Sequence, residues 1–359
     1  QKEEGNMRLK KGIINIALIL AVIAWGLSAN QEKVQASDAD LGFEPYVTDY
    51  ATPAKQETEW KTDGIYEYAL IRNKTAIKLM IVKPQHTKKI IVPSQFHGLP
   101  VKELAFVDAG KAETLVISDG IEVIDHQAAK ANPYLKKIHL GKDVQYIGSW
   151  AFAYNKRLQK VTGGEDVRFV GRCAFDGLTK MKNLPEFVYN GKNCKYYRAI
   201  FRNMKSLKKV VLPKDADYTL TMFKKCVDLK YAEVKGAGFR INKRIWHAML
   251  PEYINNEMFS DCRSLKTVKL YNGITKLNYG MFSGCVKLQK VNIPKKCTYI
   301  GINTFRNCKS LRKLTIPKSV KKIDKTAFRG CKKLTLYVKK GSYAHKYAKK
   351  YHIKYKLVK

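Results

Sequence analysis

Apolar residues recur along this chain with a period of 23 residues. Phe259, Phe282, Phe305 and Phe328 are evenly spaced at that interval. In the unit that begins at Phe305, apolar residues or cysteine stand at offsets +3, +6, +9, +11, +15 and +18, and proline stands at +12. One unit has too few apolar residues to form a core of its own, so the repeats must stack and share one.

Within each unit, the apolar residues at +9 and +11 alternate with polar ones, which predicts a short strand with two side chains facing inwards. The proline at +12 ends that strand because it has no N–H to donate to a ladder. The spacing L-x-x-L-x-L in a unit of this length is typical of leucine-rich repeats. We therefore expect a leucine-rich repeat solenoid of about ten coils, with short parallel strands on the concave face and irregular or short helical segments on the convex face.

The same period continues towards the N-terminus, with some irregularity. Phe106, Ala129, Phe152 and Phe175 keep the 23-residue step. Phe201 and Phe223 follow after altered steps, and the region 176–258 is irregular. We interpret 236–259 as a truncated unit in which Trp246 takes the phenylalanine position.

Both ends of a solenoid need a cap, because an end coil would otherwise expose apolar side chains. The sequence 66–82 alternates like a strand and is expected to cover the first coil, within an N-terminal cap and first repeat at 61–105. The repeats proper are placed at 106–335. In the closing segment 336–359, tyrosine and alanine recur at helical spacing between Tyr343 and Tyr351, which predicts a short capping helix.

Three segments of this chain resemble the BspA-like bacterial leucine-rich repeat family. The repeat "TFRNCKSLRKLTIPKSVKKIDKTAF" is similar to that family's unit, 88–106 is similar to its first unit, and 336–358 is similar to its closing segment. The resemblance covers roughly residues 61 to 358 and implies an exported surface protein with a binding or adhesive role. It brings no catalytic residues and no cofactor with it.

The N-terminal region has the features of a signal peptide, which we place at 1–36 with six extra residues before Met7. A basic stretch at 7–11 precedes the apolar stretch 12–27, and Val34-Gln35-Ala36 offers a small-x-small cleavage site. An uncleaved membrane anchor is the alternative, and would be the chain's one attachment to a membrane. We expect the protein to be secreted and associated with a cell surface.

Charge is large and unevenly distributed. The formal net charge is +38, and 27 Lys or Arg face only Asp261 and Asp324 between Phe259 and Lys359. The segment 37–60, interpreted as an acidic flexible linker, carries six acidic residues and only Lys55. A surface this basic favours an anionic partner. Because we expect the protein to be exported, we do not expect nucleic acid as its partner. The remaining partners are a host protein, a host glycan or an anionic cell-wall polymer.

The residues expected to meet that partner are the outward ones at +8 and +10 of each strand, which form a ladder of positive charge on the concave face. They include the following candidate ligand-binding residues: Lys137, His139, Lys160, Lys209, Lys269, Lys290 and Lys313. A solvent-exposed face without a ligand is the alternative for any single lysine.

Other chemistry-bearing residues favour structural roles. Five of the eight cysteines stand at +3, where we expect packed free thiols, with disulfides between coils as the alternative. No CxxC pair or recurring histidine spacing suggests a metal site. No catalytic motif is present, so an enzyme with an unrecognised site ranks behind a binding module and behind a wall-retained structural protein.

Overall fold

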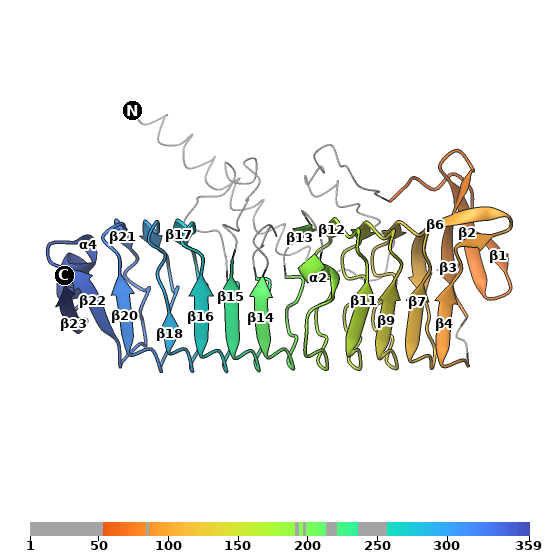
Figure 1. Ribbon diagram of the computed structural model, residues 1–359. Coiled ribbons are helices and arrows are strands. Elements are labelled where there is room, and N and C mark those ends of the chain that lie inside the picture. Colours follow the sequence, from red (N-terminus) through yellow and green to blue (C-terminus); the bar gives the residue numbers. More distant parts are fainter. Residues whose placement is uncertain (1–52, 84–85, 191–193, 197–198, 213–220, 236–256) are drawn as a thin grey trace, which may run out of the picture. The chain divides into compact units, whose positions relative to one another are not determined.

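The computed structural model describes residues 53–83, 86–190, 194–196, 199–212, 221–235 and 257–359. Every described residue lies in one compact unit, which spans 50–359. In this unit, successive coils stack through parallel strands (Figure 1), which confirms the predicted leucine-rich repeat solenoid.

One strand per coil lies on what we call the long-strand face. Burial alternates along these strands except in the last, Tyr355–Val358; in β9 (Lys137–Leu140), Ile138 and Leu140 are buried while Lys137 and His139 are exposed. The predicted inward and outward positions are therefore confirmed. The other long strands are β4 (Lys89–Val92), β7 (Thr114–Ile117), β11 (Lys160–Gly163), β14 (Lys209–Leu212), β15 (Tyr231–Val234), β16 (Thr267–Leu270), β18 (Lys290–Val291), β20 (Lys313–Ile316), β22 (Thr335–Lys339) and β23 (Tyr355–Val358).

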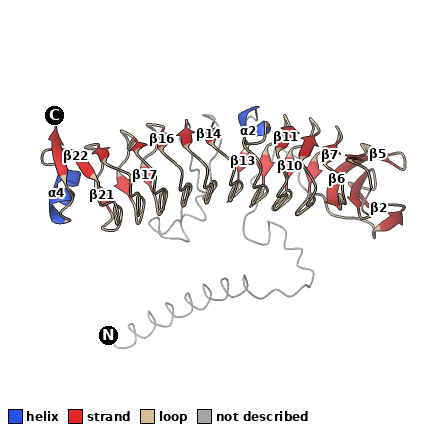
Figure 2. Ribbon diagram, turned by 90° about the horizontal axis from the view of Figure 1, so that it is seen from below, coloured by secondary structure: helices blue, strands red, loops and turns tan. Residues whose placement is uncertain are grey.

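A second row of two-residue strands was not predicted from the sequence. It lies opposite the long strands, and turns connect the two rows (Figure 2). The expected short helical segments of the convex side are turns in most coils. The short strands are β8 (Val123–Ile124), β10 (Tyr146–Ile147), β12 (Phe169–Val170), β13 (Lys195–Tyr196), β17 (Lys276–Leu277), β19 (Tyr299–Ile300) and β21 (Lys322–Ile323).

The repeated phenylalanines form a continuous stack, the Phe column. Neighbouring ring centroids lie 5.3–5.8 Å apart, within the range of offset aromatic stacking. All of these rings are buried. The column consists of Phe152, Phe175, Phe201, Phe223, Phe259, Phe282, Phe305 and Phe328.

Two expectations for this column need correction. Phe106 is 39% exposed, because it lies near the end of β6 (Leu99–Val107) and its neighbour Val107 takes the buried place. Trp246 lies outside the described residues. Phe223 and Phe259 stack directly with 5.7 Å between their centroids, and β15 pairs directly with β16. No additional coil therefore separates these two phenylalanines.

In five coils, the cysteine at +3 supplies a hydrogen-bond donor that links the coil to the one before it. Each of these thiols donates to the carbonyl oxygen of the phenylalanine one coil earlier, with 2.9–3.2 Å between sulfur and oxygen. The cysteines are Cys226, Cys262, Cys285, Cys308 and Cys331. All eight cysteines are free and buried. Burial raises the pKa of the Cys226 thiol to about 12, so the sulfur keeps the proton that it donates.

In the N-terminal coils, asparagine performs the same task. The Asn155 amide donates to the carbonyl oxygens of Ala129 and Phe152 at 2.8 Å, and its Oδ1 accepts from the Asn132 backbone N–H at 2.9 Å. Asn132 Oδ1 accepts in turn from Ala109 N–H at 2.7 Å. The +3 position is thus a polar link within the core, which hydropathy alone does not show.

The long strands form three separate sheets, with one break at α2 and another between β18 and β20. The coil after β11 carries the short helix α2 (Phe187–Asn190) in place of a long strand, and α2 lies between β11 and β14 in Figure 1. The Phe187 ring is buried 5.8 Å from Phe175, centroid to centroid. The strands of this face therefore form separate sheets on the two sides of α2.

At the N-terminal end, an antiparallel arrangement covers the first coil as predicted. β2 (Tyr66–Ile71) pairs with β1 (Lys61–Asp63) and with β3 (Ala76–Ile81), which joins β6 in parallel. The small strand β5 (Gln95–Phe96) pairs with β6. Residues 54–58 lie along β2, where Glu57 N–H donates to Leu70 O at 2.9 Å. The last part of the predicted acidic linker is therefore bound to the cap.

At the other end, the predicted capping helix is α4 (Tyr343–Lys350). Ser342 caps it by accepting the His345 N–H at 3.2 Å, and Ala344, Tyr347 and Ala348 face inwards. The Tyr347 ring meets Phe328, the last ring of the Phe column, with 6.2 Å between centroids. Its hydroxyl donates to Asp324 O at 2.9 Å. The helix thus covers the apolar end that the last coil would expose.

Candidate binding face

The candidate ligand-binding residues all lie on the long-strand face, but they do not form one ladder. Lys137 is adjacent to Lys160 in the register of β9 and β11. Beyond α2, Lys209 is followed across the sheet by Tyr231, Thr267 and Lys290. The predicted series of one lysine per coil is interrupted by α2 and again by β15, whose outward residues are Tyr231 and Glu233, while the coil of β16 keeps Lys269.

Carboxylates partly neutralise the lysines of the N-terminal sheet. Lys160 Nζ lies 3.3 Å from Glu186 Oε1, just before α2. His139 Nδ1 lies 2.9 Å from Thr162 Oγ1 on the neighbouring strand, so its ring is held by a side chain of the face itself. Lys136, at the edge of the same sheet, forms an ion pair of 2.6 Å with Glu113. Among the described residues, Lys160 and Lys136 are therefore paired with carboxylates, whereas Lys137 forms no ion pair and lines a smaller hollow with Lys180 and Lys182.

Tyr231 lies between two of the candidate lysines. Lys209 Nζ and Lys269 Nζ lie 5.7 Å and 5.8 Å from its ring centroid, within cation–π range. Its hydroxyl donates to Glu233 Oε2 at 2.7 Å. This hydrogen bond, helped by Lys269 and Lys235, lowers the pKa of Glu233. The motif therefore holds an ionised carboxylate at one border of the most basic part of the face.

That part is an open hollow of about 1430 Å³ over β15, β16, β18 and β20, which we call the C-terminal hollow. Of the described residues, Glu233 is the one acidic residue that lines it, and neither Asp261 nor Asp324 does. No ion pair joins its cations to a carboxylate among the described residues. The cations are Lys235, Lys269, Lys290, Lys295, Arg312, Lys313 and Lys333.

Three of the candidate residues, Lys269, Lys290 and Lys313, line this hollow. The sequence did not indicate the others, because they stand at offsets other than +8 and +10. Lys333, Arg312 and Lys295 are at +5, +7 and +13 of their units. Their gathering depends on how the chain bends around the long strand. A charge count over every offset of adjacent units could have found them.

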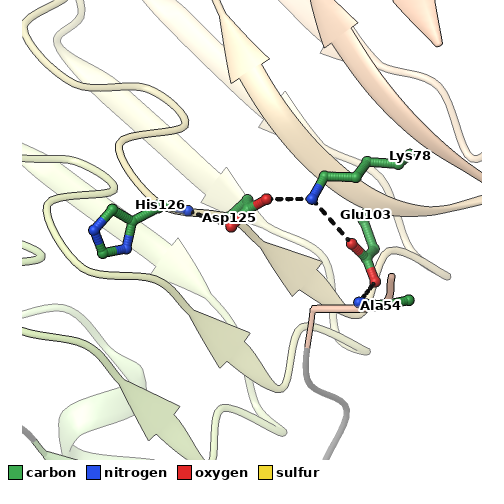
Figure 3. A network of polar contacts seen from close by, with 5 residues as sticks. All are labelled: Ala54, Lys78, Glu103, Asp125 and His126. Carbon is green, nitrogen blue, oxygen red and sulfur yellow. Dashed lines mark hydrogen bonds and ion pairs between the residues drawn. The ribbon is translucent and has the colours of Figure 1, made fainter. Parts of the chain in front are cut away.

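Elsewhere, a buried polar cluster lies beside the N-terminal cap (Figure 3). The Glu103 carboxyl is fully buried; its Oε1 accepts Ala54 N–H at 2.6 Å, and its Oε2 lies 3.6 Å from Lys78 Nζ. Lys78 also pairs with Asp125, which accepts the His126 backbone N–H at 2.7 Å. Burial, reinforced by Asp125, raises the pKa of Glu103 to about 7 despite the opposing effects of Ala54 N–H, Lys78 and Arg72.

This raised pKa predicts a pH-dependent stability. The folded state holds the Glu103 proton more tightly than the unfolded state, so the associated stability is complete below pH 4.5 and is lost as the pH rises through about 7. We expect the stability of the natural chain relative to Glu103→Gln to fall by about 2–3 kcal/mol between pH 5 and pH 8. Urea unfolding at each pH measures this difference.

The matched control is Glu113→Gln. The Glu113 carboxylate is paired with Lys136 in solvent, and its pKa is lowered. It is therefore ionised in both folded and unfolded chains throughout this pH range, and its replacement should leave the pH dependence unchanged. If the difference in free energy of unfolding between the natural chain and Glu103→Gln did not change with pH, this would contradict an uncharged, buried Glu103.

Among the described residues, no group of three or more His, Cys, Asp or Glu side chains is arranged to hold a metal ion. The same residues include no helix with the length and apolar character to cross a membrane. The stretch 12–27 lies outside them.

Comparison with known proteins assigns the fold to a family. A model of the BspA type leucine-rich repeat region matches six copies, over residues 85–182 and 241–348. These matches cover more than half of the chain, and the chain therefore belongs to the BspA type leucine-rich repeat family. A search of curated proteins found no match.

Among solved structures, that of a pneumococcal antigen agrees with this fold, and two further leucine-rich repeat proteins show weaker similarity. The pneumococcal vaccine antigen PcpA is 17% identical, with a TM-score of 0.53 over 79% of this chain and 82% of that one. A leucine-rich repeat protein from Bacteroides ovatus is 16% identical, with a TM-score of 0.42 over 83% and 100%. A leucine-rich cell surface protein from Faecalibacterium prausnitzii is 18% identical, with a TM-score of 0.35 over 80% and 96%.

Proposed function

We propose that this protein is an exported, surface-associated binding module that attaches to a host protein, a glycan or an anionic polymer through its long-strand face. The unpaired cations of the C-terminal hollow are the observation that carries this proposal. Seven positive side chains around one hollow repel one another, and an anionic partner relieves that repulsion. The signal-like sequence at 7–36 supports export. We expect no catalytic activity.

The alternative is a structural envelope protein that anionic wall polymers retain without specific recognition. The openness of the hollow favours it, because an open basic surface accepts many polyanions. Release from the producing cells by moderate salt, with no binding to matrix proteins or mucin, would support this alternative over adhesion.

The proposal predicts binding to polyanions that weakens steeply with salt. The triple variant Lys269→Glu, Lys290→Glu, Lys313→Glu reverses the charge of three side chains of the hollow. It should abolish most binding of the full chain to immobilised heparin and polyphosphate. Each contact that is lost should lower the slope of log affinity against log salt by about 1. Binding is measured between about 50 and 200 mM salt.

The control is Lys309→Glu, Lys325→Glu, Lys332→Glu, which changes the net charge equally within the same region of the chain. These three lysines are exposed but do not line the hollow. Equal losses in both triple variants would mean that net charge alone governs binding. No binding of the natural chain to either polymer would overturn the proposal.

A further inference from the structure

Neutral hydrogen-bonding groups stand between the cations of the C-terminal hollow. Gln289, Ser310, Thr267 and Thr315 line it together with the lysines. Hydroxyl and amide groups both donate and accept hydrogen bonds, whereas lysine and arginine only donate. A polymer that carries anionic groups alone would need only the cations. A polymer that also carries hydroxyl groups could use both kinds of side chain.

One aromatic ring of the hollow is positioned for contact with a ligand. Tyr271 directly follows β16 and is 42% exposed. Its ring lies against the backbone of Gly273, where an added Cβ would come within 2.3 Å of Tyr271 Cε1. Gly273 thus allows one edge of the ring to rest on the chain while the ring remains open to solvent. Exposed aromatic faces bind the C–H faces of sugars, because the ring face is electron-rich.

At the floor of the hollow, the side chain of Asn292 takes the place of strand backbone in the hydrogen bonding of the sheet. β18 ends at Val291, and the next residue, Asn292, completes the pairing with its amide. Its Oδ1 accepts Leu270 N–H, and its Nδ2 donates to Leu270 O, each at 2.7 Å. The backbone groups of β16 are satisfied here, so a ligand meets side chains and not an open sheet edge.

The cations are spaced for a chain that crosses the coils. Lys290 and Lys313 occupy the same position in consecutive coils, as the first residues of β18 and β20. Lys269 lies one strand before Lys290 and two positions further along it. Single-stranded nucleic acid is held by several aromatic side chains that stack on its bases. Within the described part of the chain, Tyr271 is the one aromatic residue that lines this hollow.

We propose that the C-terminal hollow binds an acidic polysaccharide, a chain of sugars that carries sulfate or carboxylate groups. The cations bind the anionic groups, the neutral side chains bind sugar hydroxyls, and Tyr271 packs on a sugar ring. This inference rests on the proposed function, from which it selects one class of partner.

The test compares heparin, which combines sulfate and carboxylate groups with sugar rings, with polyphosphate of similar length, which has no sugars. Tyr271→Ala should weaken binding of the full chain to heparin by about tenfold and leave polyphosphate binding within about twofold. Tyr271→Phe keeps the ring and should retain most of the affinity. Gly273→Ala displaces the ring and should reproduce the selective loss. Unchanged melting temperatures exclude unfolding, since Tyr271 is exposed.

The outcomes separate this inference from the proposed function. Equal binding of both polymers, with Tyr271→Ala without effect on either, overturns the polysaccharide assignment and leaves the proposed function standing. Tighter binding of single-stranded DNA than of heparin also overturns the assignment. Loss of all polyanion binding by the natural chain overturns both proposals.

Discussion

Replacement of Phe282 by alanine is expected to lower the free energy of unfolding by about 3–5 kcal/mol. Its ring is fully buried and stacks on Phe259 and Phe305 at 5.8 Å and 5.3 Å between centroids. The neighbouring coils cannot close the resulting cavity without giving up the strand pairing on either side. Urea unfolding followed by circular dichroism measures the loss.

The chain offers a matched control in Phe106→Ala. Phe106 occupies the same repeat position in the first coil, but its side chain is 39% exposed and lies outside the Phe column. Its replacement should cost about 1–2 kcal/mol, well below the loss at Phe282. Similar losses for Phe106→Ala and Phe282→Ala would show that the stacked rings do not hold the coils together.

The second large effect is expected for Asn155→Ala, at about 3 kcal/mol. The substitution leaves the Asn132 N–H and the Ala129 carbonyl without their partner in the core, at a site with no exposure to water. Buried polar groups that lose their partners cost more than the hydrogen bonds themselves contribute.

Asn155→Cys distinguishes a lost hydrogen bond from lost volume. Cysteine occupies this position in the C-terminal coils and donates to the preceding carbonyl, as Cys285 does to Phe259 O at 3.0 Å. The cysteine variant should keep the bond to Ala129 O and lose only the acceptor for Asn132 N–H, so its stability should fall between the natural chain and Asn155→Ala. If Asn155→Cys and Asn155→Ala were equally stable, this would contradict a hydrogen-bond donor role for the side chain at this position. Thermal unfolding under reducing conditions measures the order.

The fold could be predicted because the core residues of a solenoid recur in the sequence at a regular interval. Phe305, Leu311 and Leu314 each join a column of equivalent residues, so one unit predicts the next. The closing helix followed from the spacing of tyrosine and alanine. The donor role of the +3 position could not be predicted, because cysteine appears apolar in a hydropathy pattern and Asn155 appears as an exception. Only the distance to the preceding carbonyl shows that both side chains do the same work.

The candidate binding face was predictable in part. Strand alternation placed Lys290 and Lys313 outwards, as the structure has them. The C-terminal hollow was not predictable, because it combines residues at several offsets from neighbouring coils. The interruption by α2 was also missed, since the sequence before Phe187 shows an irregular step without saying which element replaces the strand.

The direct contact of Phe223 with Phe259 has a consequence for how this protein can change. The path from phenylalanine to long strand has a fixed length, since Lys209, Tyr231 and Thr267 each follow their phenylalanine by eight residues. The return path from the strand to the next phenylalanine varies in its number of residues. Where this path is longest, between Tyr231 and Phe259, the centroids of the Phe223 and Phe259 rings are still 5.7 Å apart. Insertions and deletions on the return path therefore alter the surface of a coil without altering the pitch. A lineage, or a designer, can remodel that surface while the long-strand face keeps its spacing of charges.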